Sequence, residues 1–362
     1  MRATRFHGDR DIRVDHVPEP TIERSTDALV QVTLAGICGS DLHFYRAGES
    51  LGFPAGERVG HEFMGTVVAV GPDVRGLAAG DRVVASPSVA CGECELCREG
   101  IFYACAQGLG FFGFSPAFWH YGGEVQGGQS ELVRVPFADT TLIPVPQSLA
   151  GPEHEAALLP TIDVMNTGWH GATTAGVSPG AVAVVIGDGA VGLCSVHASA
   201  AMGADQVICI GHHEDRLSVA ERLGATTVIS SRDGEEVRER VRELTRGQGA
   251  PAVIASVSGA GPLALAQGCV RAGGVISCIG MDQVVGEQPQ IDWMDQFLRN
   301  ITISGGLVPG RRHVPDLIAL VEGGKIDPSP VFSHRLPLER APEGYRLMEE
   351  RADGVIKVAL AP

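Results

Sequence analysis

Residues 182–192, Val-Ala-Val-Val-Ile-Gly-Asp-Gly-Ala-Val-Gly, indicate the fold of the second half of the chain. An apolar β-type run leads directly into a Gly-x-Gly-x-x-Gly loop, and a helix is predicted to follow over residues 191–202. Glycine permits the tight turn, lets the backbone approach a pyrophosphate and lets the helix pack on the strand. This context favours a dinucleotide site over the alternative of a plain glycine-rich turn. The residues predicted to bind the dinucleotide are Gly187, Gly189, Val191 and Gly192.

Outward from this loop, strands and helices alternate with the spacing of parallel strands joined by helical crossovers. Strands are predicted at 181–187, 206–210, 227–230, 252–256, 274–279 and 301–304. Helices are predicted between them at 191–202, 214–223, 235–245 and 262–271. The fold class is therefore α/β, with a doubly wound parallel sheet of the Rossmann type in a dinucleotide-binding domain over residues 167–304.

The first part of the chain has a different texture. Short β-type runs at 29–34, 62–70, 82–85 and 131–135 alternate with Gly and Pro turns, a pattern that predicts a Greek-key or barrel-like β domain. After residue 304, helices are predicted at 314–322 and 341–350 and a strand at 354–360. These elements are too few for a third domain, so we expect the catalytic domain to comprise residues 1–166 and 305–362.

The bulk composition excludes two classes of partner. The 362 residues carry a net charge of −15, whereas nucleic-acid binding depends on clustered Lys and Arg. No stretch of membrane-spanning length is free of charges, and the N-terminus lacks an apolar leader. We therefore expect a cytoplasmic protein with no nucleic-acid or membrane partner.

Four of the nine cysteines have metal-ligand spacing. Four thiolates within one short lobe are what a closed, tetrahedral structural zinc site requires, and free surface cysteines are the weaker alternative. The predicted structural ligands are Cys91, Cys94, Cys97 and Cys105. The cysteines at 194, 209, 269 and 278 lie in apolar runs and are predicted to be reduced core residues.

The candidates for a catalytic metal site are scattered along the chain. They are Cys38, His61 with the adjacent Glu62, and Asp163. A catalytic zinc takes three protein ligands of mixed S, N and O type and keeps one position open. Spacing alone does not connect these residues, and each is as readily a structural residue held by hydrogen bonds.

The order of these motifs resembles the medium-chain, zinc-dependent alcohol dehydrogenase family over essentially the full length of the chain. The motifs that carry the resemblance are Cys-x-Ser-Asp-x-His at 38–43, Gly-His-Glu at 60–62, the four-cysteine lobe, Thr-Gly at 167–168 and the dinucleotide loop. The resemblance implies a Greek-key (GroES-like) catalytic domain and a homodimer or homotetramer. It also implies an alcohol, aldehyde or ketone as the small-molecule substrate.

The resemblance implies a role for each site residue. Cys38, His61 and Asp163 are the expected ligands of the catalytic zinc, and the Asp is similar to that of secondary-alcohol and formaldehyde-type members. Glu62 is expected beside the metal as an occasional ligand. A zinc ion lowers the pKa of a bound alcohol, and a relay through Ser40 and His43 is expected to carry the proton to solvent. Thr167 is expected to contact the nicotinamide.

The residues after the second strand of the dinucleotide domain bear on the choice of cofactor. An NAD site of this fold has an acid there for the ribose 2′-hydroxyl, and this chain has Gly211 instead. His212, His213 and Arg216 are suited to a 2′-phosphate, so NADP is favoured over NAD, with a solvated turn as the alternative. Some relatives place a basic residue after the first zinc cysteine to hold the pyrophosphate. Because residue 39 is Gly here, Lys357 is the candidate for that charge.

Two other functions share this fold. One is a zinc-free quinone or enone reductase, and the other is a dinucleotide-binding protein without turnover. The ligand set speaks against the first, and the relay residues speak against the second. The aromatic stretch at 108–128 is a candidate wall of the substrate cleft, with packing at the zinc lobe or a subunit contact as alternatives. Its aromatic residues are Phe111, Phe112, Phe114, Phe118, Trp119 and Tyr121.

Overall fold

The computed structural model describes residues 1–114, 125–257, 259–281 and 290–362. The chain divides into two compact units, of which the first comprises Met1–Asp163 and Pro309–Pro362 and the second comprises Val164–Val308. The sequence-based boundaries lie three to four residues inside the second unit. Phe118, Trp119 and Tyr121 of the predicted aromatic stretch lie outside the described residues.

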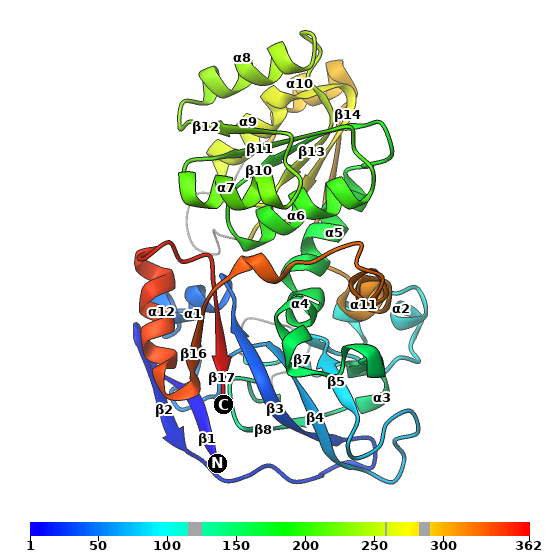
Figure 1. Cartoon of the computed structure of the whole chain (residues 1–362), viewed down its shortest axis with the longest axis vertical. Coiled ribbons are helices and arrows are strands. Elements are labelled where there is room, and N and C mark those ends of the chain that lie inside the picture. Colours follow the sequence, from blue (N-terminus) through cyan, green and yellow to red (C-terminus); the bar gives the residue numbers. More distant parts are fainter. Residues whose placement is uncertain (115–124, 258, 282–289) are drawn as a thin grey trace. The chain divides into compact units, whose positions relative to one another are not determined.

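The second unit is built on a parallel sheet in the order β12-β11-β10-β13-β14-β15. Helices α5, α6 and α7 lie on one face, and α8, α9 and α10 lie on the other (Figure 1). The strands are β10 (Val182–Ile186), β11 (Gln206–Gly211), β12 (Thr227–Ser230), β13 (Ala250–Ala255), β14 (Val270–Cys278) and β15 (Thr302–Gly305). The helices are α5 (Val164–Thr174), α6 (Ala190–Ala201), α7 (Glu214–Arg222), α8 (Gly234–Leu244), α9 (Ala260–Cys269) and α10 (Trp293–Arg299).

This arrangement follows from the character of the strands. The central strands β10 and β13 are covered on both faces, so nearly every side chain in them is buried and they read as continuous apolar runs. Val184, Ile208, Val253 and Ile276 form the centre of the core. The predicted six-stranded, doubly wound sheet is confirmed. Its strand order reverses direction between β10 and β13, which is where this class of sheet binds ligands.

The first unit contains a seven-stranded sheet in the order β16-β17-β3-β4-β5-β9, with β8 paired to β3. Strands β1 (Arg2–Gly8) and β2 (Asp11–His16) form a separate hairpin. The other strands are β3 (Ala28–Ile37), β4 (Glu62–Val70), β5 (Arg82–Ala85), β6 (Ser88–Val89), β7 (Gly110–Phe111), β8 (Leu132–Val135), β9 (Leu142–Pro144), β16 (Phe332–Pro337) and β17 (Lys357–Ala361). The C-terminal tail therefore adds strands to the N-terminal sheet, and β17 pairs directly with β3.

Short helices connect the strands of the first unit. They are α1 (Asp41–Ala47), α2 (Glu95–Arg98), α3 (Ala138–Thr141), α4 (Glu155–Leu158), α11 (Val314–Glu322) and α12 (Ala341–Glu350). The Ala/Leu-rich segment near 153–159 does not form one continuous helix. It is divided between a 3-10 turn at Pro152–His154, α4 and a second 3-10 turn at Leu159–Ile162. Pro160 has no backbone N–H, so the α-helical hydrogen bonding of α4 stops before it.

Candidate active site

Four potential metal ligands from distant parts of the chain converge in the first unit. Donor atoms of Cys38, His61, Glu62 and Asp163 all lie within 4.8 Å of one another. Cys38 follows the end of β3, and His61 and Glu62 stand where β4 begins, so the antiparallel pairing of Gly36 with Glu62 brings these two strand ends together. Asp163 arrives at the end of the 3-10 turn Leu159–Ile162. The three predicted zinc ligands, which spacing alone did not connect, are neighbours in space.

The orientation of His61 is set by groups on both ring nitrogens. Nε2 forms a hydrogen bond with Oδ2 of Asp163 at 3.2 Å and with Oγ of Ser40 at 3.4 Å. On the other side of the ring, Nδ1 lies 3.1 Å from Oδ1 of Asp41, which is almost fully buried. The backbone N–H of Cys38 donates to Oδ2 of the same Asp41 at 2.9 Å. Asp41 therefore links two of the predicted ligands and directs Nε2 of His61 toward the other donor atoms.

The electrostatics of the cluster favour a bound cation. Burial, and then the charge of Asp163, raise the pKa of Cys38 to about 11. Burial raises the pKa of Glu62 to about 8, although Lys357 favours its charged form. Burial disfavours the charged form of Asp163 as well, but its hydrogen bonds with His61 and Glu62 outweigh this and lower its pKa. Three acidic groups thus share a dry site, and a divalent cation among them would stabilise all three as anions. The donor set fits zinc.

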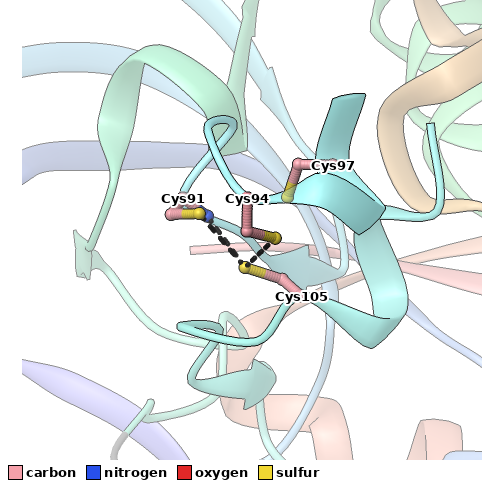
Figure 2. Close-up of side chains that lie close together, drawn as sticks. All are labelled: Cys91, Cys94, Cys97 and Cys105. Carbon is pink, nitrogen blue, oxygen red and sulfur yellow. Dashed lines mark hydrogen bonds between the residues drawn. The ribbon is translucent and has the colours of Figure 1, made fainter. Parts of the chain in front are cut away.

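The four-cysteine lobe also has the geometry of a metal site, and all four sulfur donors lie within 4.8 Å of one another. Figure 2 shows the four side chains directed toward a common centre. Sγ of Cys105 lies 3.4 Å from Sγ of Cys91 and 3.9 Å from Sγ of Cys94, so these sulfurs are not bonded as disulfides. Zn–S bonds of about 2.3 Å in a tetrahedron place sulfur atoms about 3.8 Å apart. The lobe therefore fits a closed structural zinc site.

Backbone N–H groups support the thiolate form in this lobe. The amide of Cys91 donates to Sγ of Cys105 at 3.3 Å, and the amide of Glu93 donates to Sγ of Cys91 at 3.4 Å. Hydrogen bonds from the backbone of Cys97 and Ala106 lower the pKa of Cys94 to about 6. Burial raises the pKa of Cys97 and of Cys105, so a bound cation would be needed to hold these two cysteines as thiolates.

The dinucleotide loop lies between β10 and α6 in the second unit, as the sequence predicts. A side chain at Gly192 would place its Cβ 2.0 Å from the carbonyl oxygen of Gly187, so only glycine allows the helix to approach the loop this closely. Gly189 is the residue before α6, so the first backbone N–H groups of this helix face out of the loop. The loop therefore fits an anionic pyrophosphate at the helix N-terminus.

The comparisons with known proteins agree with this geometry. Residues 24–147 match the family model of the alcohol dehydrogenase GroES-like domain, and residues 190–323 match that of the zinc-binding dehydrogenase domain. The chain belongs to the zinc-dependent medium-chain alcohol dehydrogenase family. It is an oxidoreductase of the alcohol dehydrogenase type.

Full-length relatives support the assignment to this alcohol dehydrogenase family. A zinc-type alcohol dehydrogenase-like protein of Bacillus subtilis is 34% identical, and the match covers 100% of both chains. An alcohol dehydrogenase of Cupriavidus necator is 30% identical over 100% of this chain and 99% of its own. Among solved structures, the alcohol dehydrogenase TADH from Thermus sp. ATN1 has a TM-score of 0.89 at 34% identity, over 100% of this chain and 99% of that chain.

The predicted proton relay of this dehydrogenase begins beside the metal cluster. Ser40 immediately precedes α1, and its hydroxyl contacts the Nε2 atom of His61. His43 lies in the first turn of α1, three residues after Ser40, so the two side chains share one side of the helix start. Thr167 lies in the first turn of α5, in the second unit.

The expectation that Lys357 provides charge for the pyrophosphate is corrected by its burial. Lys357 is 1% exposed and Glu62 is 0% exposed, and Nζ donates to Oε1 of Glu62 at 2.6 Å and to the backbone carbonyl of Ile37 at 3.1 Å. Burial lowers the pKa of Lys357, but the charge of Glu62 more than compensates and the net shift is upward. The ammonium group is thus engaged inside the first unit, where it holds Glu62 beside the predicted zinc ligands.

The described part of the aromatic stretch packs around the cluster of predicted metal ligands. The ring of Phe114 meets the ring of His61 edge-on at 5.1 Å, and it meets that of Phe44 at 4.9 Å. Phe112 packs edge-on against Phe63 in β4, with 5.0 Å between the ring centroids. These contacts place Phe114 at the site and Phe112 in the core beneath it.

In the part of the chain that the structure describes, no helix is long and apolar enough to span a bilayer.

Two residues, one beside the predicted metal ligands and one in the dinucleotide loop, were not assigned a role from the sequence. Asp41 is the Asp of the Cys-x-Ser-Asp-x-His motif, and its place in that motif was the only signal that could have identified it. Asp188 is the second residue of the glycine loop, and its carboxylate lies beside Gly211 at the end of β11. The backbone N–H groups of His212 and His213 donate to this carboxylate at 2.8 and 2.9 Å.

Proposed function

We propose that this enzyme transfers a hydride between a nicotinamide dinucleotide and an alcohol or carbonyl substrate at a zinc ion held by Cys38, His61 and Asp163. The observation that carries this proposal is the convergence of these donor atoms in a buried cluster. When bound, zinc supplies Lewis acidity that lowers the pKa of an alcohol and polarises a carbonyl. The nicotinamide carries the redox chemistry, with Thr167 proposed as its contact.

The proton of the alcohol is proposed to leave through Ser40 and His43. Ser40 is the hydroxyl that reaches the ligand atom of His61, so it is the first group outside the cluster able to accept a proton. His43 is partly exposed and can exchange the proton with solvent. In the direction of carbonyl reduction, the same two groups return the proton.

Glu62 is proposed as an occasional fourth protein ligand. Lys357 holds one of its carboxylate oxygens, Oε1, at 2.6 Å. The other oxygen, Oε2, is buried, and no donor reaches it among the described residues. With one oxygen held by Lys357 and no geometric hydrogen bond on the other, Glu62 would be able to offer Oε2 to a bound metal. The structural zinc is proposed to hold the lobe of Cys91, Cys94, Cys97 and Cys105 together without taking part in turnover.

The choice between NADP and NAD rests on two opposed features. The absence of an acid at Gly211, with His212, His213 and Arg216 nearby, supports the sequence-based preference for NADP. The Asp188 carboxylate opposes the preference for NADP, because this carboxylate already accepts hydrogen bonds from His212 and His213.

The family resemblance supports a homodimer or homotetramer. The nine free cysteines are typical of a reducing compartment and support a cytoplasmic location.

The proposed function is tested by metal analysis combined with steady-state kinetics. We expect catalytic zinc in the purified enzyme and oxidation of an alcohol series with NAD or NADP. The variant Asp163→Ala should lose the catalytic zinc and should also lose turnover. Cys194→Ala, which changes a buried cysteine of the other unit, is the control and should keep both. Enone reduction by a protein without catalytic zinc would support the quinone reductase alternative. Dinucleotide binding without hydride transfer across the series would support a non-catalytic role.

A further inference from the structure

The carboxylate missing from the end of β11 is supplied from another part of the chain. In the NAD sites of this fold, the acid stands at the end of the second strand, where Gly211 is found here. The side chain of Asp188 extends from the glycine loop to that place. A Cβ added at Gly211 would lie 2.5 Å from Oδ2 and 2.6 Å from Cβ of Asp188. The two positions therefore share one space, and a side chain at one excludes a side chain at the other.

Asp188 also occupies the groups that suit a 2′-phosphate. Oδ2 accepts hydrogen bonds from the backbone N–H groups of His212 at 2.8 Å and His213 at 2.9 Å. The ring Nδ1 of His213 lies 3.0 Å from the same oxygen, and Nη1 of Arg216 lies 3.9 Å from Oδ1. The ring of His213, the guanidinium of Arg216 and the backbone N–H of His212 thus lie against a carboxylate of the protein, where a 2′-phosphate would need them.

The carboxylate is held as an anion. Asp188 is 5% exposed, and burial disfavours its charged form. The backbone hydrogen bonds from His212 and His213 outweigh this effect, and the pKa of Asp188 lies below its ordinary value. A dianionic 2′-phosphate at the end of β11 would face this fixed negative charge, whereas a ribose hydroxyl can donate a hydrogen bond to it.

We infer that Asp188 selects the cofactor by taking the role of the ribose-binding acid, and that the enzyme therefore prefers NAD to NADP. This inference rests on the proposed function only in that the loop of residues 187–192 binds a dinucleotide. It reverses the preference for NADP that was expected from Gly211. The acid that is missing at the end of β11 is replaced by Asp188, whose carboxylate lies at the same place.

Binding of ligands that lack nicotinamide tests the inference apart from turnover. ADP-ribose and 2′-phospho-ADP-ribose are titrated calorimetrically into the full-length enzyme. We expect ADP-ribose to bind at least about 10-fold more tightly, and Asp188→Asn to change the ratio of the two dissociation constants about 10- to 100-fold in favour of the phosphorylated ligand. Asp215→Asn removes an exposed charge from the same turn and should leave the ratio unchanged.

A relocated carboxylate provides the second test. Asp188→Gly should lose the preference for ADP-ribose, and the double variant Asp188→Gly/Gly211→Asp should regain it, because the space freed at residue 188 admits a side chain at 211. Tighter binding of 2′-phospho-ADP-ribose to the wild type, or an unchanged ratio in Asp188→Asn, would overturn the role of Asp188 and leave the proposed function intact. Failure of the wild type to bind either ligand would overturn the dinucleotide site itself.

Discussion

Replacement of Lys357 by Met should destabilise the first unit strongly. Nζ and the Glu62 carboxylate are 2.6 Å apart and almost fully buried, so removal of the ammonium leaves a carboxylate without its cation beside Asp163. Loss of one partner of a buried ion pair costs about 3–5 kcal/mol. Because Met has a similar length and is apolar, we attribute little of this cost to lost packing. The free energy of unfolding of Lys357→Met should fall by about that amount.

The reason for this cost is separated from packing by a double-mutant cycle. Glu62→Gln removes the charge that Lys357 neutralises, so the double variant Glu62→Gln/Lys357→Met buries no unpaired ion. Its loss of stability should be smaller than the sum of the two single losses by about 2–3 kcal/mol. Urea unfolding of the zinc-loaded proteins, followed by far-ultraviolet circular dichroism at pH 9, above the pKa of about 8 that burial gives Glu62, measures each value. Additive losses would show that Lys357 and Glu62 do not depend on each other, and the argument from the buried pair would be refuted.

Further predictions concern the relay, the two metal sites and Asp188. Ser40→Ala should lower kcat about 100-fold at pH 7 with bound zinc retained, and an unchanged kcat would exclude the relay. Asp41→Asn should weaken zinc binding about 10- to 100-fold in a chelator competition, since His61 loses its orienting carboxylate. Cys97→Ser should lose one equivalent of zinc by metal analysis and unfold at lower temperature, while the catalytic zinc stays. Asp188→Asn should cost ~2 kcal/mol at pH 7. Because the folded-state pKa of Asp188 lies below its ordinary value of 3.8, the difference from wild type in urea unfolding should shrink only as the pH falls below that value.

Those parts of this protein that depend on residues close together along the chain could be predicted from the sequence. The alternation of strand and helix after residue 181, the glycine loop and the four-cysteine lobe each depend on residues that are close along the chain. Their physical cause is local, because hydrophobic period, backbone freedom at glycine and ligand spacing act within a few turns of the chain. The predicted bounds of β4, β5, β12, α11 and α12 match the structure for the same reason.

The pairing of the buried polar groups depends on contacts between distant parts of the chain and could not be predicted in this way. Lys357 pairs with Glu62, 295 residues away in the sequence, because β17 lies beside β3. The residues around Lys357 and those around Glu62 do not predict this pairing. Asp188 fills the space beside Gly211 although the two residues belong to different strand ends. Charges and carboxylates act through distance in space, at a strength that burial controls. Residue type and spacing therefore predict a dinucleotide-binding sheet and a four-cysteine metal lobe, and the family resemblance adds the zinc dehydrogenase. The partner of each buried charge is set only when the sheets bring the strand ends together.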